Sequence, residues 1–268
     1  MAVQRSRSRT SAHRRARPGP DAPIGSIDVS EERGVRYLHF GSRWIQGAMR
    51  LAHADALELE YTRDMMFPLL LHPAPWPARV LQIGLGAASI TRFLHRHRPD
   101  AALTVVEIEP RVVAAARHHF RLPGASPRLA LEIGDGAAYL GRPGPAFDWI
   151  IVDGFDEHGL AGALDTRAFY AHCRARLDPA GVLCTNLLRR TRGVSPSVAR
   201  LQAAFDGRAC ALPACASGNT VALAVTGPRL ALDAGALHGA AVALKAATGL
   251  DLRRLAARAA AEESCKAL

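Results

Sequence analysis

A regular alternation of strand-like and helix-like patterns from residue 79 onwards is the strongest constraint on the fold. The predicted elements are strand 79–84, helix 87–98, strand 103–108, helix 110–121, strand 129–133, strand 147–152, helix 166–177, strand 181–187 and helix 196–205. Runs such as "WIIV" are apolar almost without interruption, which is typical of strands buried on both faces. The alternation therefore predicts an α/β fold with a mostly parallel sheet covered by helices on both faces.

Less regular patterns flank this core. Residues 24–40 contain short β-prone pieces broken by glycine, which predict a small antiparallel hairpin unit. Residues 54–71 follow with apolar residues at helical spacing. After the core, residues 209–214 and 220–226 predict an antiparallel pair at the sheet edge, and residues 234–261 predict an Ala-rich helical tail.

The positive charge of the chain is unevenly distributed. Of the net charge of +10, residues 1–22 supply six Arg minus Asp21, or +5. Such a segment is too polar to bury a core, so we expect a disordered, solvated tail. The alternative is a nonspecific contact with RNA, DNA or an anionic surface, and we expect no further nucleic-acid binding. We divide the remaining chain into residues 23–70, a small β unit plus lead-in helix, and residues 71–268, a Rossmann-like catalytic domain.

The cysteines and the apolar segments indicate the cellular compartment in which the protein is expected. The five cysteines are an odd number without a C-x-x-C pair, so we expect them to be reduced and structural. No apolar stretch of about 18 residues could span a bilayer. The first residues lack the apolar middle segment of a secretory signal. The sequence therefore predicts a cytoplasmic protein with no membrane span.

A glycine turn follows the first predicted strand, in "ARVLQIGLGAASI". Gly84 and Gly86 lie where an open parallel sheet binds its ligands, beyond the carboxyl end of a strand. Glycine lets the backbone approach a ligand closely, although the same residues can form only a tight turn. The third glycine of the dinucleotide fingerprint is replaced by Ser89, which disfavours NAD.

Carboxylates follow the next two predicted strands. Glu107 stands 21 residues after Gly86, near the position of a ribose-binding carboxylate, and its alternative is a solvated strand end. Asp135 opens a short helix, where it can cap the helix or accept a hydrogen bond from an adenine amino group. The glycine turn and both acids mark three successive strand ends, which together favour an adenosine pocket.

The fourth predicted strand bears on the chemistry. It ends at Asp153, and Asp156 follows three residues later. Acids there can be turn formers or helix caps. Beside an adenosine pocket they suggest a different use, because an alkylammonium must lose a proton before its nitrogen can attack carbon. Asp153 is the better candidate for this base.

Six segments in this order resemble the spermidine synthase (polyamine aminopropyltransferase) family. They are "RWIQGAMRLAHADALELEYTRDMM", "VLQIGLGAAS", "VVEIEPRVVAAARHHF", "IGDGAAYL", "FDWIIVDGFDEHG" and "FYAHCRARLDPAGVLCTNL". The resemblance implies a methyltransferase-like Rossmann sheet with a small N-terminal β domain. It also implies aminopropyl transfer from decarboxylated S-adenosylmethionine to a small-molecule amine, release of methylthioadenosine, no tightly bound cofactor and a homodimer.

The resemblance also assigns roles to residues. Gln46, Gly84, Gly86, Glu107, Asp135 and Gly136 would hold the nucleoside. Asp153 would accept the proton, and Asp156 and Tyr61 would bind the amine. We expect no metal, because His95, His97, His118 and His119 lack ligand spacing.

Departures from the family pattern fall on the acceptor side. Ala87 replaces the family's diamine-binding Asp, Thr62 and Arg63 replace His-Glu after Tyr61, and residues 156–160 replace the D-P-x-G-P loop. Loss of a carboxylate that pairs with an ammonium removes roughly 1.5 to 3 kcal/mol. The acceptor is therefore left open. An S-adenosylmethionine-dependent methyltransferase or a catalytically silent nucleoside-binding relative are the alternatives.

Overall fold

A computed structural model describes residues 25–41, 44–156, 159–188, 193–230 and 232–262, with Cys265 and Leu268. The Arg-rich segment 1–22 lies outside the described residues, so its expected disorder stays a prediction. Within the described part of the chain, no helix has both the length and the apolar character needed to cross a bilayer.

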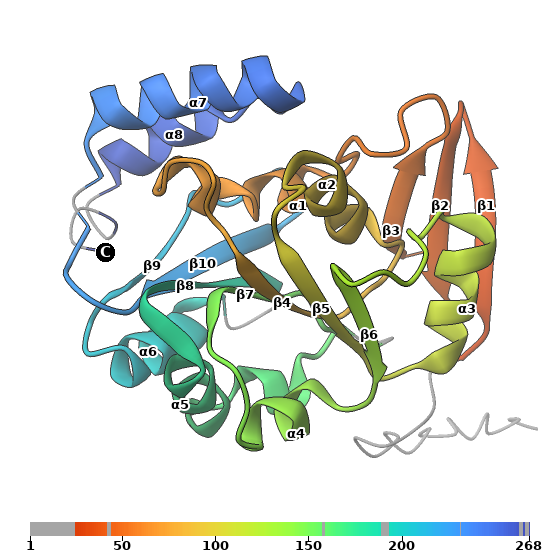
Figure 1. Ribbon diagram of the computed structural model, residues 1–268, viewed down its shortest axis with the longest axis horizontal. Helices are drawn as coiled ribbons and strands as arrows, with labels where there is room; N and C mark the ends of the chain where they lie inside the picture. The colour runs from red at the N-terminus through yellow and green to blue at the C-terminus, as the bar shows by residue number, and fades with distance from the viewer. Residues whose placement is uncertain are drawn as a thin grey trace, which may run out of the picture.

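The predicted Rossmann-like sheet is confirmed, with seven strands in the order β6-β5-β4-β7-β8-β10-β9 (Figure 1). The strands are β4 (Arg79–Ile83), β5 (Ala102–Glu107), β6 (Leu129–Ile133), β7 (Phe147–Val152), β8 (Leu177–Leu188), β9 (Ala209–Ala211) and β10 (Asn219–Val225). The first five are parallel, and β10 runs antiparallel to both β8 and β9. The predicted antiparallel edge is thus also confirmed.

Helices cover both faces of this sheet, as the apolar strands predict (Figure 1). One apolar core contains residues of α2 (Ser89–His97), α3 (Pro110–His119), α7 (Ala234–Thr248) and α8 (Arg253–Ala261). A second core contains residues of α4 (Gly136–Gly141), α5 (Arg167–Ala175) and α6 (Ser195–Ala204). The expected helical tail is present as two helices, because Gly249 adopts a left-handed φ of 78° and ends α7 before α8 begins.

The N-terminal unit is a three-stranded antiparallel sheet. The predicted hairpin is present as β1 (Ile27–Glu32) and β2 (Val35–Phe40), and β3 (Ile45–Arg50) adds a strand that the pattern did not predict. The lead-in segment forms only the short α1 (Glu60–Asp64) and a 3-10 turn at Phe67–Leu70, because Pro68 stands where a longer helix would need an N–H donor. A further 3-10 turn spans Gly162–Asp165. Residues of β2 and β3 belong to the first core, so this apolar core is shared by the N-terminal unit and the larger sheet.

The cysteine prediction is wrong for one pair. Cys210 and Cys265 form a disulfide across a sequence separation of 55 residues, whereas Cys173, Cys184 and Cys215 are free and buried. The tertiary reason is that the fold places Cys265 beside Cys210 of β9, and the N–H of Leu230 also donates to the carbonyl of Leu268 at 2.6 Å. Two cysteines in separate apolar segments give no sequence signal of this contact.

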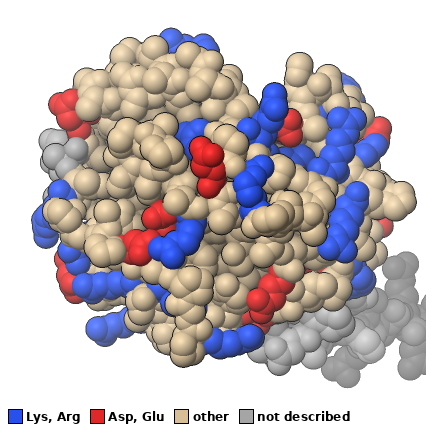
Figure 2. Space-filling view, viewed as in Figure 1, with Lys and Arg blue, Asp and Glu red and all other residues tan. Residues whose placement is uncertain are grey.

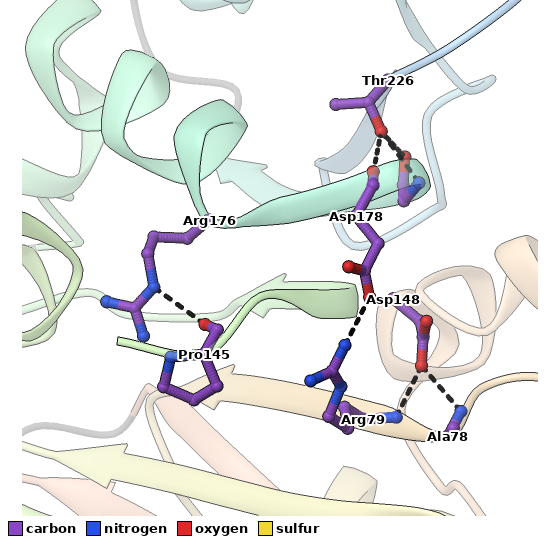
Figure 3. A network of polar contacts seen from close by, with 8 residues as sticks. Ala78, Arg79, Pro145, Asp148, Arg176, Asp178 and Thr226 are labelled. Carbon is purple, nitrogen blue, oxygen red and sulfur yellow. Dashed lines mark hydrogen bonds and ion pairs between the residues drawn. The ribbon is translucent and has the colours of Figure 1, made fainter. Parts of the chain in front are cut away.

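Polar contacts tie the strands together at their N-terminal ends (Figure 3). Asp148, the second residue of β7, accepts from the N–H groups of Ala78 and Arg79 at 2.8 and 2.6 Å. The Arg79 guanidinium in turn pairs with Asp178 at 2.9 Å. Strands β4, β7 and β8 are therefore clamped at the end opposite to the one where the sequence places its ligand site.

Asp64, at the end of α1, gives a prediction about stability and pH. It is 9% exposed, and burial, followed by the negative charge of Glu60, raises its pKa to about 7. The stabilising effect of the protonated carboxyl is fully present below the unfolded pKa and is lost as the pH rises through 7. We expect Asp64→Asn to leave stability unchanged near pH 4 and to raise it at pH 8.5, by up to about 4 kcal/mol.

Urea unfolding at both pH values measures this difference. The same substitution at the exposed Asp100 controls for the loss of one carboxylate. A difference between Asp64→Asn and wild type that does not grow with pH would contradict the buried carboxyl.

Candidate active site

The candidate site lies where the chain changes direction across the sheet. From β4 the chain adds β5 and β6 on one side and then β7 and β8 on the other. Such a switch point leaves a crevice at the carboxyl ends of the two central strands. Gly84 follows β4 and Asp153 follows β7, so these two predicted site residues lie on either side of this crevice.

Gly84 is required by the close approach of the two turns. Its φ is 88°, and a Cβ atom there would lie 2.1 Å from the carbonyl oxygen of Asp153. The main chain of Asp153 is held in place by its own N–H, which donates to the carbonyl of Ile83 at 2.9 Å. The predicted glycine therefore positions the carboxylate, as well as giving room near a ligand.

Asp153 is held by two neutral donors. The Nδ2 atom of Asn186, in β8, donates to Oδ1 of Asp153 at 2.9 Å, and the hydroxyl of Tyr61 also donates to this carboxylate. Burial raises the pKa of Asp153, and the two hydrogen bonds act in the opposite direction. The carboxylate is therefore fixed in position, and its pKa is raised above the usual range of an aspartate.

A side-chain relay orients Asn186. The amide nitrogen of Asn219 donates to Oδ1 of Asn186 at 3.0 Å, which leaves the Nδ2 atom of Asn186 directed at Asp153. Ser217 donates in turn to Asn219 at 2.9 Å. The sequence analysis missed these residues, and the signal that could have found Asn186 is a polar residue inside an otherwise apolar strand.

A cavity of about 10 Å³ connects the predicted residues. It is lined by Gln46, Gly47, Tyr61, Thr62, Gln82, Leu85, Gly86, Ala87, Ser89, Ile90 and Asp153. Four of the predicted site residues, Gln46, Tyr61, Gly86 and Asp153, thus meet in one place. Asp153 supplies the single carboxylate among these lining residues, and the other polar groups are neutral.

Small residues join the N-terminal sheet to the glycine turn. A Cβ atom on Gly47 would lie 2.5 Å from Cβ of Ala87, so the two backbones pack directly against each other. The hydroxyl of Ser89 donates to the carbonyl of Ala48 at 2.8 Å. Ser89, which departs from the dinucleotide fingerprint, therefore holds β3 against the start of α2.

Gln82, another residue that the sequence analysis missed, holds the glycine turn through its side-chain amide. Its Nε2 atom donates to the carbonyl of Gly84 at 2.7 Å, and the hydroxyl of Thr91 donates to its Oε1 atom at 2.8 Å. The signal that could have found Gln82 is a polar side chain inside the apolar run "VLQIG". The turn is thus held by fixed polar groups before any ligand binds.

Glu107 braces the same turn. Its carboxylate accepts from the N–H groups of Leu85 at 2.8 Å and Glu109 at 2.9 Å, so it is not a freely solvated strand end. Burial raises its pKa, and the main-chain donors oppose this effect. A carboxylate has about four acceptor positions. Main-chain N–H groups of Leu85, Gly86, Ile108 and Glu109 act on this carboxylate, so most of these positions are used within the turn, and a role toward ribose hydroxyls stays a prediction.

Asp135 caps a helix, as one of the two interpretations of the sequence predicts. Its Oδ1 atom accepts from the N–H groups of Ala137 at 2.6 Å and Ala138 at 3.0 Å at the start of α4. Gly136 is buried, and a Cβ atom there would lie 2.4 Å from Cγ2 of Ile83. Gly136 therefore lets α4 begin against the end of β4.

Asp156 lies in an exposed turn beyond Asp153. Its Oδ1 atom accepts from the N–H of Leu160 at 2.7 Å, and its own N–H donates to the carbonyl of Leu160 at 3.0 Å. The turn-forming interpretation of this acid is confirmed. Its second role, in binding an amine, stays a prediction.

Two exposed aliphatic side chains were missed. Ile108, next to Glu107, is 63% exposed, and Ile133, at the end of β6, is 55% exposed. Large apolar side chains at two neighbouring strand ends provide a surface that a flat nucleobase can cover. No group of three or more His, Cys, Asp or Glu side chains in the described ranges is arranged to hold a metal ion.

Asn186 gives a prediction about the pH dependence of the site. Its hydrogen bond favours the ionised form of Asp153, so Asn186→Ala should raise the pKa of that carboxyl. A base is active only when ionised, and activity is lost as the pH falls through its pKa. We therefore expect the acid limb of kcat/KM for the variant to move to higher pH, with Gln202→Ala as a control on the surface of α6.

A profile that shifts to lower pH, or that does not shift, would contradict this role for Asn186. A uniform loss of rate at every pH would instead indicate a purely structural effect. The profile should be measured with the substrates of the reaction proposed below.

Comparisons with known proteins agree with this geometry. Residues 58–189 match the family described as "Spermine/spermidine synthase domain". A polyamine aminopropyltransferase of Chromobacterium violaceum is 38% identical over 211 residues, which cover 79% of this chain and 80% of that protein. A probable spermidine synthase from Corynebacterium glutamicum superimposes with a TM-score of 0.68 at 20% identity, over 86% of this chain and 96% of that chain. Human methyltransferase-like protein 13 in complex with SAH superimposes with a TM-score of 0.64 at 26% identity, over 71% of this chain and 93% of that chain.

Proposed function

This chain belongs to the spermine/spermidine synthase family, and on that premise we propose that it transfers an aminopropyl group from decarboxylated S-adenosylmethionine to a small-molecule amine. The observation that carries the proposal is Asp153, a half-buried carboxylate in the cavity at the switch point. It is held by Asn186 and Tyr61, neither of which is charged.

The chemistry follows from this placement. The acceptor nitrogen attacks the methylene carbon next to the positive sulfur, a C–N bond forms, and the C–S bond breaks with its electron pair going to sulfur. Methylthioadenosine leaves, and the proton that the acceptor ammonium loses goes to Asp153. A carboxylate of raised pKa suits this task, because general bases work best when their pKa lies near the working pH.

The nucleoside should lie over the ends of β4, β5 and β6. Main-chain groups of Gly84 and Gly86 and the side chain of Gln46 would contact it on the cavity side. Glu107 would accept from the ribose, and Asp135 with Gly136 would meet the base. The exposed Ile108 and Ile133 support this placement, since they offer apolar surface beside both acids.

On the acceptor side we propose that Tyr61 and Asp156 contact the amine. The neutral lining at Ala87 and Thr62 leaves one carboxylate in the cavity, so a second cationic group of the acceptor would have to reach Asp156. No tightly bound cofactor is needed for this transfer, since the co-substrate brings the reactive sulfonium.

A homodimer and a cytoplasmic location are further proposals from the family resemblance. The Cys210–Cys265 disulfide argues against the cytoplasmic location, because disulfides are rare in reducing compartments. Size-exclusion chromatography tests the dimer, and thiol counting on protein from freshly lysed cells tests whether this bond exists in the cell.

The deciding experiment measures methylthioadenosine release from decarboxylated S-adenosylmethionine with mono-, di- and triamines as acceptors. Release that depends on an amine supports the proposal. The fold is shared with methyltransferase-like protein 13, so S-adenosylmethionine is tested in parallel. Methyl transfer without any methylthioadenosine release would replace the proposal, and nucleoside binding without turnover would indicate a silent relative.

A further inference from the structure

A second pocket lies apart from the active-site cavity and shares no lining residue with it. Its volume is about 440 Å³, and its walls are residues 52–56 after β3, the last turn of α2, Arg121 beyond α3 and Thr248 at the end of α7. In Figure 2 a hollow opens at the upper edge of the molecule, between the lobe of α7 and α8 and the N-terminal sheet, with several basic side chains beside it. We call this site the rear pocket.

The rear pocket is basic. Arg96, Arg121, His53 and His97 line it, against the single carboxylate of Asp55. Several other surface arginines pair with acids, as Arg50 does with Glu58 at 2.5 Å. Neither Arg96 nor Arg121 makes an ion pair or a side-chain hydrogen bond to any residue that the structure describes. Two exposed arginines without such partners therefore line one pocket.

Two walls of this pocket are fixed by Arg92, which lies on α2 and is 2% exposed. Its Nε atom donates to the carbonyl of Ala54 at 2.8 Å, and its Nη1 atom donates to the carbonyl of Phe120 at 2.5 Å. These carbonyls belong to the residues next to Asp55 and Arg121. A binding site whose walls are already held loses little conformational entropy when a ligand enters.

The backbone at Arg121 is set by the end of α3. Its φ of 49° lies in the left-handed region, and the N–H of Leu122 donates to the carbonyl of Ala116 at 3.1 Å, as in a Schellman-type helix C-terminus. This helix end fixes where the chain presents the arginine side chain at the pocket.

We infer that the rear pocket binds a small molecule that carries a phosphate or carboxylate group, held between Arg96 and Arg121. Guanidinium groups match the geometry of both oxyanions and bind them with charge-assisted hydrogen bonds. The volume falls in the range of small-molecule sites. Asp55 can accept a hydrogen bond from a hydroxyl or amine of the same ligand, and the inference does not depend on the reaction at Asp153.

Basic residues near helix ends have a second physical role. Arg96 lies in the last turn of α2, where a positive charge stabilises the helix dipole. That role predicts an effect on thermal stability and none on anion binding. The test therefore measures binding directly, and it includes Arg121, which lies two residues beyond the end of α3.

Isothermal titration calorimetry with inorganic phosphate and with citrate, at constant ionic strength set by sodium chloride, tests the inference. We expect saturable binding of at least one probe at one site per chain. The double variant Arg96→Gln/Arg121→Gln should bind about tenfold more weakly or worse. The double variant Arg167→Gln/Arg254→Gln removes the same charge at exposed positions on α5 and α8 and should bind like wild type.

Which probe binds identifies the oxyanion. Methylthioadenosine affinity, where wild type shows it, should be unchanged in the Arg96/Arg121 variant, which separates this pocket from the active site. If the double variant does not fold, Arg121→Gln alone serves. No saturable binding by wild type, or equal binding by both double variants, overturns the inference.

Discussion

Asp153→Asn should lower the rate of aminopropyl transfer by roughly 10² to 10⁴ while the protein stays folded and binds its nucleoside. Asparagine has the shape of aspartate and keeps an oxygen that can accept from Asn186 or Tyr61. It cannot take a proton from the acceptor. Stability should not fall, because burial of this carboxylate disfavours its charged form. Steady-state release of methylthioadenosine measures the rate, and thermal unfolding checks the fold.

Two comparisons separate a base from an electrostatic anchor. Raising the pH should partly restore Asp153→Asn, since more of the amine is then already neutral. Asp156→Asn, the matched control in the exposed turn, should mainly raise the KM for the amine, because a group that holds a distal charge contributes to ground-state binding. An Asp153→Asn variant with wild-type rate at neutral pH would remove Asp153 from the mechanism.

Glu107→Gln should weaken methylthioadenosine binding by about tenfold to a hundredfold, the cost of losing a charge-assisted hydrogen bond. The structure adds a second effect. The amide nitrogen of glutamine would face one of the main-chain N–H groups, such as that of Leu85 or Glu109, that now donate to the carboxylate. A buried donor left without an acceptor costs about 1 to 3 kcal/mol, so the melting temperature should also fall.

Calorimetric titration with methylthioadenosine measures the affinity, and thermal unfolding measures the stability. Glu132→Gln, on the neighbouring strand β6, is the matched control and should change neither. Unchanged nucleoside affinity in a folded Glu107→Gln variant would show that Glu107 only braces the turn. The adenosine site would then lie elsewhere on the sheet edge.

The fold could be predicted from local patterns because its central strands are buried on both faces. A run such as "WIIV" between turn signals has few alternatives to a parallel strand, and the strand–helix alternation then fixes the layers. Where the pattern was weak, the prediction failed. Strand β3 contains the exposed Ile45 and the buried Met49 without a clear alternation, and it was missed. Gly249 inside an Ala-rich run was not recognised as the end of a helix.

The candidate site was predictable to the extent that its residues stand at strand ends. Glu107 ends a strand, Gly84, Asp135 and Asp153 stand just after one, and parallel strands bring their carboxyl ends to one edge. Asn186 and Gln82 could not be assigned, because a polar residue within a strand has no partner until neighbouring strands are paired. The hydrogen bonds that Asp135 and Asp156 accept from nearby main-chain N–H groups are likewise a matter of three-dimensional geometry.

The sequence by itself determined the layered sheet, the position of the glycine turn and the acids at the strand ends, because these depend on local periodicity and on short-range spacing. Only the tertiary structure decided the contacts between distant segments: Gly47 against Ala87, Asn186 and Tyr61 at Asp153, the Cys210–Cys265 disulfide and the rear pocket. Such contacts depend on which surfaces the packing of whole elements brings together. The local sequence hardly indicates these contacts, because many residues of similar size and polarity could occupy either side of such a contact.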